Sequence, residues 1–133
     1  MAGNKSERVL VDEWRDILAL HARTLCELDR ALHQHGLGAS DFEVLDVLAE
    51  GAAEDGGAAC RVQEIASRVH LSQSALSRLI ARLEKDGLVC RGMCSEDRRG
   101  VRVTLTDKGR AVHAEVRPLQ RSVLSRMLNG PQG

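Results

Sequence analysis

Residues 71–91 read LSQSALSRLIARLEKDGLVCR, and this stretch predicts an amphipathic helix with a defined start and end. Ser72 is a good N-cap, because its side-chain oxygen can accept a hydrogen bond from a free amide of the first turn. The apolar positions recur at helical spacing and are Ala75, Leu76, Leu79, Ile80 and Leu83. Gly87 suits the left-handed residue that follows a helix, with Leu88 as the apolar contact beyond it. One face of this helix is therefore expected to be buried.

A shorter apolar pattern lies just ahead of this helix. Residues 61–69 read RVQEIASRV and predict a short helix. Its apolar side is formed by Val62, Ile65, Ala66 and Val69. Two helices joined by a tight turn form a helix-turn-helix, in which the second helix lies in the major groove of DNA. The pair therefore predicts a DNA-binding unit.

The outward face of the longer helix carries hydrogen-bonding and basic side chains. Once the apolar face is turned inward, the residues that remain outside are Gln73, Ser74, Ser77, Arg78 and Arg82. Glutamine can pair with adenine and arginine with guanine in the major groove, and serine can bond bases or phosphates. No carboxylate interrupts this face before Glu84. These five residues are our candidates for DNA contact, although the alternative is an ordinary amphipathic helix with a polar outer face.

A basic hairpin is expected to follow. Residues 94–100, CSEDRRG, lie between two apolar stretches of strand-like composition, 88–90 and 101–105. This arrangement predicts a β-hairpin over residues 88–105 with Arg98 and Arg99 at its tip. Such a hairpin can act as a wing beside the helix in the groove. The alternative is a solvated tip that contacts nothing.

Two long helices are predicted at the ends of the chain, over residues 8–35 and 107–128. Each carries an apolar seam in steps of three and four, which is typical of a helix that packs along its length against another helix. The first seam is Val11, Trp14, Leu18, Leu25, Leu28 and Leu32, and the second is Val112, Val116, Leu119, Val123 and Met127. Both helices are therefore expected to pair with other helices.

The segment between the first long helix and the helix pair predicts one more helix. Ser40 or Asp41 is the expected cap, and the helix is expected to run to about Glu50. Residues 51–59, GAAEDGGAA, are rich in glycine and alanine and predict a loop.

Composition places the chain among globular proteins and localises its basic charge. The chain has 133 residues, 43% of them hydrophobic, which suits a single domain with a core. The net charge is zero, but residues 61–110 hold 11 Lys/Arg against 6 Asp/Glu, while residues 1–60 hold 5 against 12. A contact with phosphates is therefore expected in the middle of the chain. No apolar run has the length of a membrane span, and no signal peptide is recognisable, so a cytoplasmic protein without a membrane partner is expected.

The same stretches resemble the MarR family of winged-helix repressors. The resemblance is carried by LSQSALSRLIARLEKDGLVCR and SEDRRGVRVTLTDKGR, which contain the family's recognition helix, its "RLE+DGLV" exit and its "DxRRxxxxLTxxGR" wing in order and at family spacing. It covers roughly residues 40 to 115. One departure is His70 in the turn, where the family usually has Gly or Asn. A left-handed conformation at His70 would carry some strain.

The resemblance implies a fold and a function. The expected fold is mainly α, an α+β winged helix, with residues 1–133 as one MarR-like domain. Residues 41–105 would form the winged helix-turn-helix, and the helices 8–35 and 107–128 the dimerisation region, which in the family usually includes a further helix. The implied function is a repressor that binds a near-palindromic, double-stranded operator as a homodimer. Arg98 or Arg99 would enter the minor groove, attracted by its negative potential.

The family also responds to small molecules or to oxidation, which gives two groups of candidate residues. An inducer, often phenolic or carboxylate-bearing, could contact Trp14, His21, Asp46 and His113, of which Trp14 and His21 are equally explained as interface packing. The candidates for oxidation are Cys60, Cys90 and Cys94, because arginines beside the wing cysteines favour the reactive thiolate. A disulfide between Cys90 and Cys94, or from either to Cys60 on a neighbouring strand, would distort the wing. Cys26 is expected to be a packing residue.

Other functions find less support in the sequence. It has no phosphate-binding glycine loop, nucleophile elbow or HExxH motif, so an enzyme is not expected. No tight metal-ligand spacing is present, and neither a metal nor a cofactor is expected. The remaining alternative is a winged-helix module that binds another protein without specific DNA binding.

Overall fold

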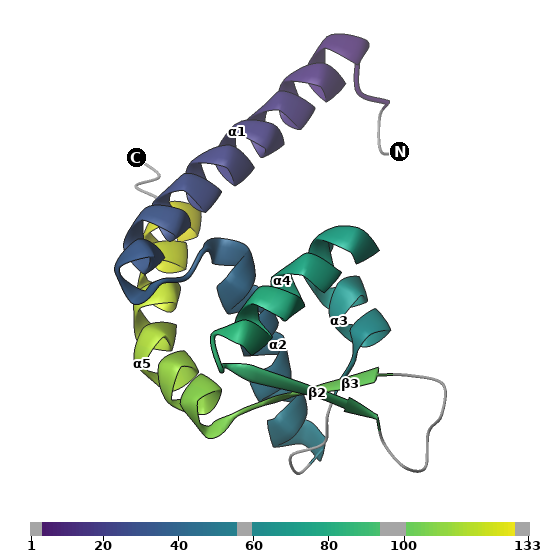
Figure 1. The fold of residues 1–133 in the computed structure, drawn as a ribbon. Helices are drawn as coiled ribbons and strands as arrows, with labels where there is room; N and C mark the ends of the chain where they lie inside the picture. The colour runs from purple at the N-terminus through teal and green to yellow at the C-terminus, as the bar shows by residue number, and fades with distance from the viewer. Residues whose placement is uncertain (1–3, 56–59, 94–100, 130–133) are drawn as a thin grey trace.

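The computed structural model describes residues 4–55, 60–93 and 101–129. Five α-helices and a small antiparallel sheet make up this part of the chain (Figure 1). The elements are α1 (Glu7–Leu32), the 3₁₀ turn η1 (His33–His35), α2 (Ala39–Asp55), β1 (Cys60–Arg61), α3 (Val62–Val69), α4 (Gln73–Lys85), β2 (Val89–Met93), β3 (Val101–Leu105), α5 (Asp107–Leu124) and the π-helical turn η2 (Ser125–Asn129). The predicted fold, a mainly α winged helix, is confirmed. None of the described helices is long and apolar enough to cross a membrane.

The first helix has two different halves. Its C-terminal half lies against α5 (Figure 1). Leu28 of α1 and Val123 of α5 belong to one small buried cluster there. Its N-terminal half extends away from the rest of the chain (Figure 1). The apolar residues exposed there are Val9, Leu10, Trp14, Ile17 and Leu18. Within the described residues, the predicted seam is therefore buried only at its C-terminal end.

The second helix differs from the prediction at both ends. It begins at Ala39, so Ser40 and Asp41 lie in its first turn and neither is the preceding cap. It continues through residues 51–55, which we expected to be a loop, while residues 56–59 lie outside the described part of the chain. Alanine and glutamate are strong helix formers, so this stretch extends the helix despite Gly51.

The helix-turn-helix forms as the sequence predicts. The backbone amide of Arg61 donates to the Glu64 carboxylate at 2.8 Å and closes the start of α3. His70, with φ 58° and ψ 43°, makes the turn in the left-handed region, as anticipated for this position. Ser72 then caps α4 by accepting a hydrogen bond from the amide of Ala75 at 3.2 Å. Gly87, with φ 80°, ends α4, and the amide of Leu88 returns to the carbonyl of Leu83.

The sheet has three strands in the order β1-β3-β2, all antiparallel. The two long strands form the predicted hairpin, and the last described pair is Met93 with Val101. The strand expected at Cys60 is present as β1, but it lies beside β3 and not beside β2. It pairs Cys60 with Val103 and Arg61 with Arg102, and so joins the start of α3 to the hairpin.

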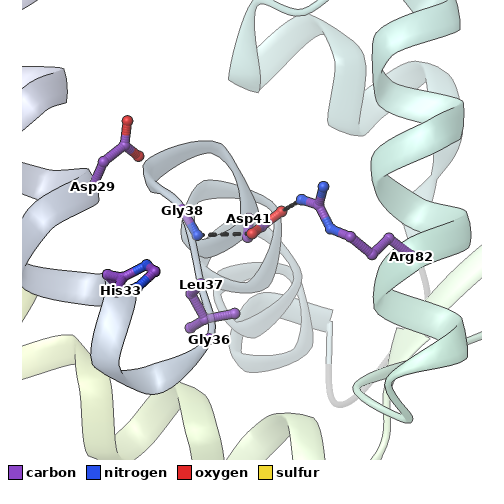
Figure 2. A pocket seen from close by; sticks show the side chains of 7 residues that line it. All are labelled: Asp29, His33, Gly36, Leu37, Gly38, Asp41 and Arg82. Carbon is purple, nitrogen blue, oxygen red and sulfur yellow. Dashed lines mark hydrogen bonds and ion pairs between the residues drawn. The ribbon is translucent and has the colours of Figure 1, made fainter.

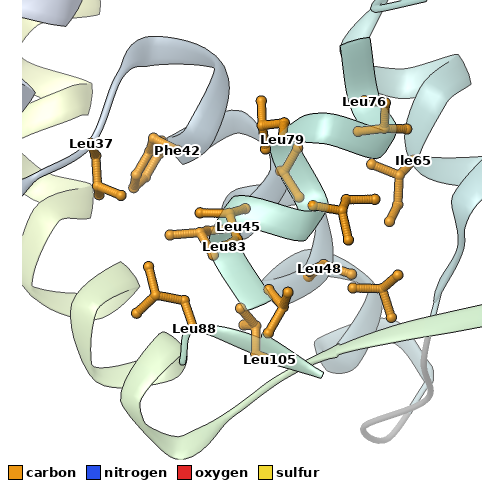
Figure 3. Packing of buried hydrophobic residues seen from close by; sticks show 14 of the residues in the cluster. Leu37, Phe42, Leu45, Leu48, Ile65, Leu76, Leu79, Leu83, Leu88 and Leu105 are labelled. Atoms are coloured by element: carbon orange, nitrogen blue, oxygen red, sulfur yellow. The ribbon is translucent and has the colours of Figure 1, made fainter. Parts of the chain in front are cut away.

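One hydrophobic core holds the winged helix together (Figure 3). Each helix from α2 to α5 and the hairpin contributes to it, and the fully buried side chains include Phe42, Leu45, Ile65, Leu76, Ile80, Leu83 and Val103. The predicted apolar face of α4 is buried in this core at every position except Ala75, which is half-buried. Because this face is fixed inward, the opposite face of α4 must point to solvent.

The start of α5 packs very closely against Leu88, in the turn between α4 and β2. Thr106 caps α5 by accepting a hydrogen bond from the amide of Gly109 at 2.9 Å, and its own amide donates to the carbonyl of Leu88. A Cβ at Gly109 would lie 2.0 Å from the same carbonyl oxygen of Leu88. The position therefore requires glycine for space.

Candidate nucleic-acid interface

The outward face of α4 holds the residues that the sequence predicted for DNA contact. Gln73, Ser74, Ser77 and Arg78 are all exposed, along the N-terminal half of the helix. The Ser74 hydroxyl lies 3.4 Å from that of Ser72, and no carboxylate occurs between Gln73 and Leu83 in the sequence. The free amides at the start of the helix add a partial positive charge. This surface can therefore donate hydrogen bonds and bind anionic groups such as phosphates.

Arg82, the fifth candidate on this helix, has a partner within the chain. Its guanidinium donates to Oδ1 of Asp41, at the start of α2 (Figure 2). The Arg82 side chain is exposed and Asp41 is buried. The contact of Arg82 with DNA stays a prediction. Its ion pair with Asp41 was not predicted from the sequence.

A second ion pair joins α4 to the hairpin. The Glu84 carboxylate accepts from Nε of Arg91, on β2, at 2.9 Å, and from its backbone amide at 3.4 Å. The pair was not predicted, although opposite charges on either side of a short turn could have suggested it. Glu84 thus fixes the start of the hairpin to α4. Arg98 and Arg99 lie outside the described residues, so their predicted role remains untested.

The four ligand candidates fall into two places. Asp46, on α2, is buried, with its Oδ1 2.7 Å from Nε2 of His113 and its Oδ2 accepting from Arg121 at 3.0 Å. The His113 ring stacks on Phe42, with 5.3 Å between the ring centroids. Trp14 and His21 are exposed on α1. Asp46 and His113 therefore link α2 to α5. They lie at a different place from Trp14, which is on the projecting half of α1.

The same α2–α5 contact perturbs one further carboxyl group. Burial, and then the negative charge of Asp46, raise the pKa of Glu43 above its usual 4.5, while Arg121 acts in the opposite direction. The amide of Gln120 donates to the Glu43 carboxylate at 3.3 Å.

Glu43→Gln is expected to raise the melting temperature near neutral pH. Because the folded chain holds this proton more tightly than the unfolded chain, the contribution of Glu43 to stability is fully present below its ordinary pKa of 4.5 and is lost as the pH rises through the raised value. Glutamine stays neutral and can still accept from Gln120. The advantage of the variant should therefore shrink as the pH falls through the raised pKa of Glu43 and should be gone below 4.5. Thermal melts of the wild type, Glu43→Gln and the exposed control Glu115→Gln across pH would measure this. An equal advantage at all pH values would contradict it.

One of the hypothetical disulfides, between Cys60 and Cys90, is contradicted by the strand order. Cys60 lies opposite Val103 and Cys90 opposite Thr104, so β3 separates the two cysteines. Their backbones are two strand spacings apart, roughly 9–10 Å, whereas a disulfide rarely spans more than about 7 Å between Cα atoms. Cys94 lies outside the described residues. Cys90 is exposed, and so is Cys26, which we had expected to be packed. Within the described residues, no group of three His, Cys, Asp or Glu side chains could hold a metal ion.

Comparisons with known proteins agree with this arrangement. The model of the MarR family matches residues 35–100. The chain is 28% identical over 97 residues to the uncharacterised HTH-type transcriptional regulator YkoM of Bacillus subtilis, a match that covers 73% of this chain and 59% of that protein. It is 25% identical over 124 residues to the HTH-type transcriptional repressor MdtR of the same organism, covering 93% and 76%. The crystal structure of AbsC, a MarR family regulator from Streptomyces coelicolor, superposes with a TM-score of 0.79 at 29% identity and covers 94% of this chain and 82% of AbsC. These relatives are transcriptional regulators, a class without enzymatic activity.

Proposed function

The chain belongs to the MarR family, and on that premise we propose that it is a sequence-specific, DNA-binding transcriptional regulator that binds a double-stranded operator as a homodimer. In this proposal the N-terminal half of α4 reads the major groove, and the tip of the hairpin contacts the adjacent minor groove.

The observation that carries this proposal is the exposed face of α4. Hydroxyl, amide and guanidinium groups follow one another there without a carboxylate, at the end of the helix that favours an anion. A helix face that had no partner would be expected to mix acidic and basic residues. Around it, the acidic Glu84 is engaged by Arg91. This electrostatic arrangement supports an anionic partner at α4.

A homodimer is supported by the apolar surface of α1. Five large apolar residues, from Val9 to Leu18, are exposed on the projecting half of this helix, and Leu128 is exposed after α5. A second copy of the chain would cover such a surface, because long helices with apolar seams associate in pairs. Two α4 helices related by a two-fold axis would then read two half-sites about one DNA turn apart, which requires a near-palindromic operator.

We propose repression as the mode of action and release by a small molecule as its control. The relative MdtR is a repressor, and a protein that occupies an operator can block transcription. An open groove of about 490 Å³ lies beside α4 and has the size of a small-molecule site. Among its lining residues are Asp29, His33, Asp41 and Arg82 (Figure 2). The alternative function is a winged-helix module that binds another protein.

A binding series with two duplexes tests the proposed function. We expect the purified chain to prefer a duplex from the region upstream of its own gene, or one selected from a randomised pool, over a scrambled duplex. We also expect affinity to fall steeply as salt rises, because each neutralised phosphate releases counterions. Light scattering at the same concentrations should give twice the 14.5 kDa mass of one chain. Failure to select any duplex, with equal and weak binding to all of them, would contradict the proposal.

A further inference from the structure

The polar side of α4 divides into two parts with different surroundings. The N-terminal half faces solvent, whereas Arg82 and Glu84 both contact other elements of the chain. Arg82 donates to Asp41 on α2, and Glu84 accepts from Arg91 on β2. The recognition helix is therefore held by one ion pair on each flank, at a point just beyond the surface that would face DNA.

Asp41 has little access to water and two protein partners. Only 7% of its side chain is exposed, against 58% for Arg82. One carboxylate oxygen, Oδ2, accepts from the backbone amide of Gly38 at 2.7 Å, and the other, Oδ1, accepts from Arg82 (Figure 2). A buried carboxylate depends on such partners, because it cannot replace them with water. Loss of the ion pair would therefore leave the Asp41 carboxylate without a replacement partner, whereas the partly solvated Arg82 guanidinium could bind water instead.

The segment that Asp41 holds connects the recognition helix to α1. Gly36, with φ 75°, turns the chain after α1, and residues 36–39 then lead into α2. Asp29, on α1, accepts from the amide of Ala39 at 2.7 Å. Two carboxylates thus fix this short connection, one from α1 and one from α2. The second of them also binds α4, so the position of α4 is linked to the helix whose apolar half is left exposed.

We propose that Arg82 is a positioning residue: through Asp41 it sets the recognition helix relative to the α1–α2 connection, and it does not itself contact DNA. This inference rests on the proposed function and adds to it. It restricts the DNA-reading surface of α4 to Gln73, Ser74, Ser77 and Arg78. It also gives a physical link between the arrangement of α1 in a dimer and the orientation of the helix that reads the operator.

The two roles of Arg82 predict opposite effects of Asp41→Asn. If Arg82 binds phosphate, loss of the Asp41 charge frees the guanidinium and removes a nearby negative charge, so DNA binding strengthens or stays unchanged. If Arg82 positions α4, the same substitution weakens the ion pair and lowers the preference for the operator. A phosphate contact also contributes to the salt dependence, so its loss reduces the slope of log affinity against log salt by about 1.

The experiment compares Arg82→Gln, Asp41→Asn and the double variant with the wild type on a duplex that the wild-type chain has selected and on a scrambled duplex. We expect each single variant to lose operator preference by about tenfold or more, and the double variant to lose no more than either single one, because coupled residues are not additive. Binding to the scrambled duplex and the salt slope should not change. Arg82→Lys, which keeps the charge, should restore part of the preference. Arg78→Gln is the matched control on the same helix, and its salt slope should fall.

The outcomes separate this inference from the proposed function. If Asp41→Asn keeps or improves operator affinity, or if Arg82→Gln lowers the salt slope as Arg78→Gln does, the positioning role is wrong while the function stands. If the wild-type chain selects no duplex at all, the proposed function itself fails. Melting temperatures identify any variant that does not fold. In that case the operator preference of Arg82→Lys, compared with that of Arg82→Gln, still tests the positioning role. A purely stabilising contact would lower the melting temperature and leave the operator preference of the folded protein intact, which would also contradict the inference.

Discussion

Replacing both Arg98 and Arg99 by glutamate is expected to weaken operator binding by at least roughly 100-fold. In the sequence the two arginines lie between β2 and β3, the strands of the hairpin that Glu84 and Arg91 fix to α4. Each substitution removes a positive charge and introduces a negative one where phosphates are expected. Fluorescence anisotropy with a labelled operator duplex across a salt series would measure both the loss of affinity and the reduced salt slope.

A charge-matched variant controls for the change in net charge. Arg15 and Arg117 are exposed on α1 and α5, outside the winged helix, and their joint replacement by glutamate changes the total charge equally. We expect this control to keep operator binding, provided that light scattering shows the same mass as for the wild type. Operator affinity that survives in Arg98→Glu/Arg99→Glu would favour a protein-binding module over a DNA-binding wing.

Gly109→Ala is expected to lower the free energy of unfolding by about 3 kcal/mol, near the upper end for overpacking. The added methyl group would lie 2.0 Å from the backbone oxygen of Leu88. That oxygen cannot move freely, because it accepts a hydrogen bond from the backbone amide of Thr106. The Thr106 hydroxyl in turn accepts a hydrogen bond from the backbone amide of Gly109. Relief of the clash would shift the start of α5 or the turn between α4 and β2. Urea denaturation followed by circular dichroism would measure the loss.

Gly92→Ala is the matched control for this substitution. Gly92 lies in β2, is exposed, and has nothing within 4 Å of the position where a Cβ would be. The same chemical change there should leave stability nearly unchanged or raise it slightly, because alanine restricts the unfolded chain. If the two variants lose similar stability, the close contact with Leu88 is not the reason that position 109 requires glycine.

Local signals in the sequence account for most of the winged helix. Ser72, Gly87 and Thr106 mark the ends of α4 and the start of α5, and each forms the cap that its residue type favours. The same logic failed at residues 51–55, where glycine and alanine suggested a loop and the structure continues α2. Alanine favours helix as readily as glycine interrupts it, so composition alone did not fix the boundary.

The sequence by itself determined which segments form helices, the caps of α4 and α5, the buried face of α4 and therefore the side chains that face outward, because hydrophobic periodicity and capping act over a few residues. Only the tertiary structure decided which charged groups have partners inside the chain. Arg82 and Asp41 are 41 positions apart, and Asp46 and His113 are 67 apart. An exposed arginine on a helix can pair equally well with water, with phosphate or with a distant carboxylate, and its residue type is the same in each case. The choice depends on which carboxylate the packing of α2 brings beside α4, and that is a property of the folded chain.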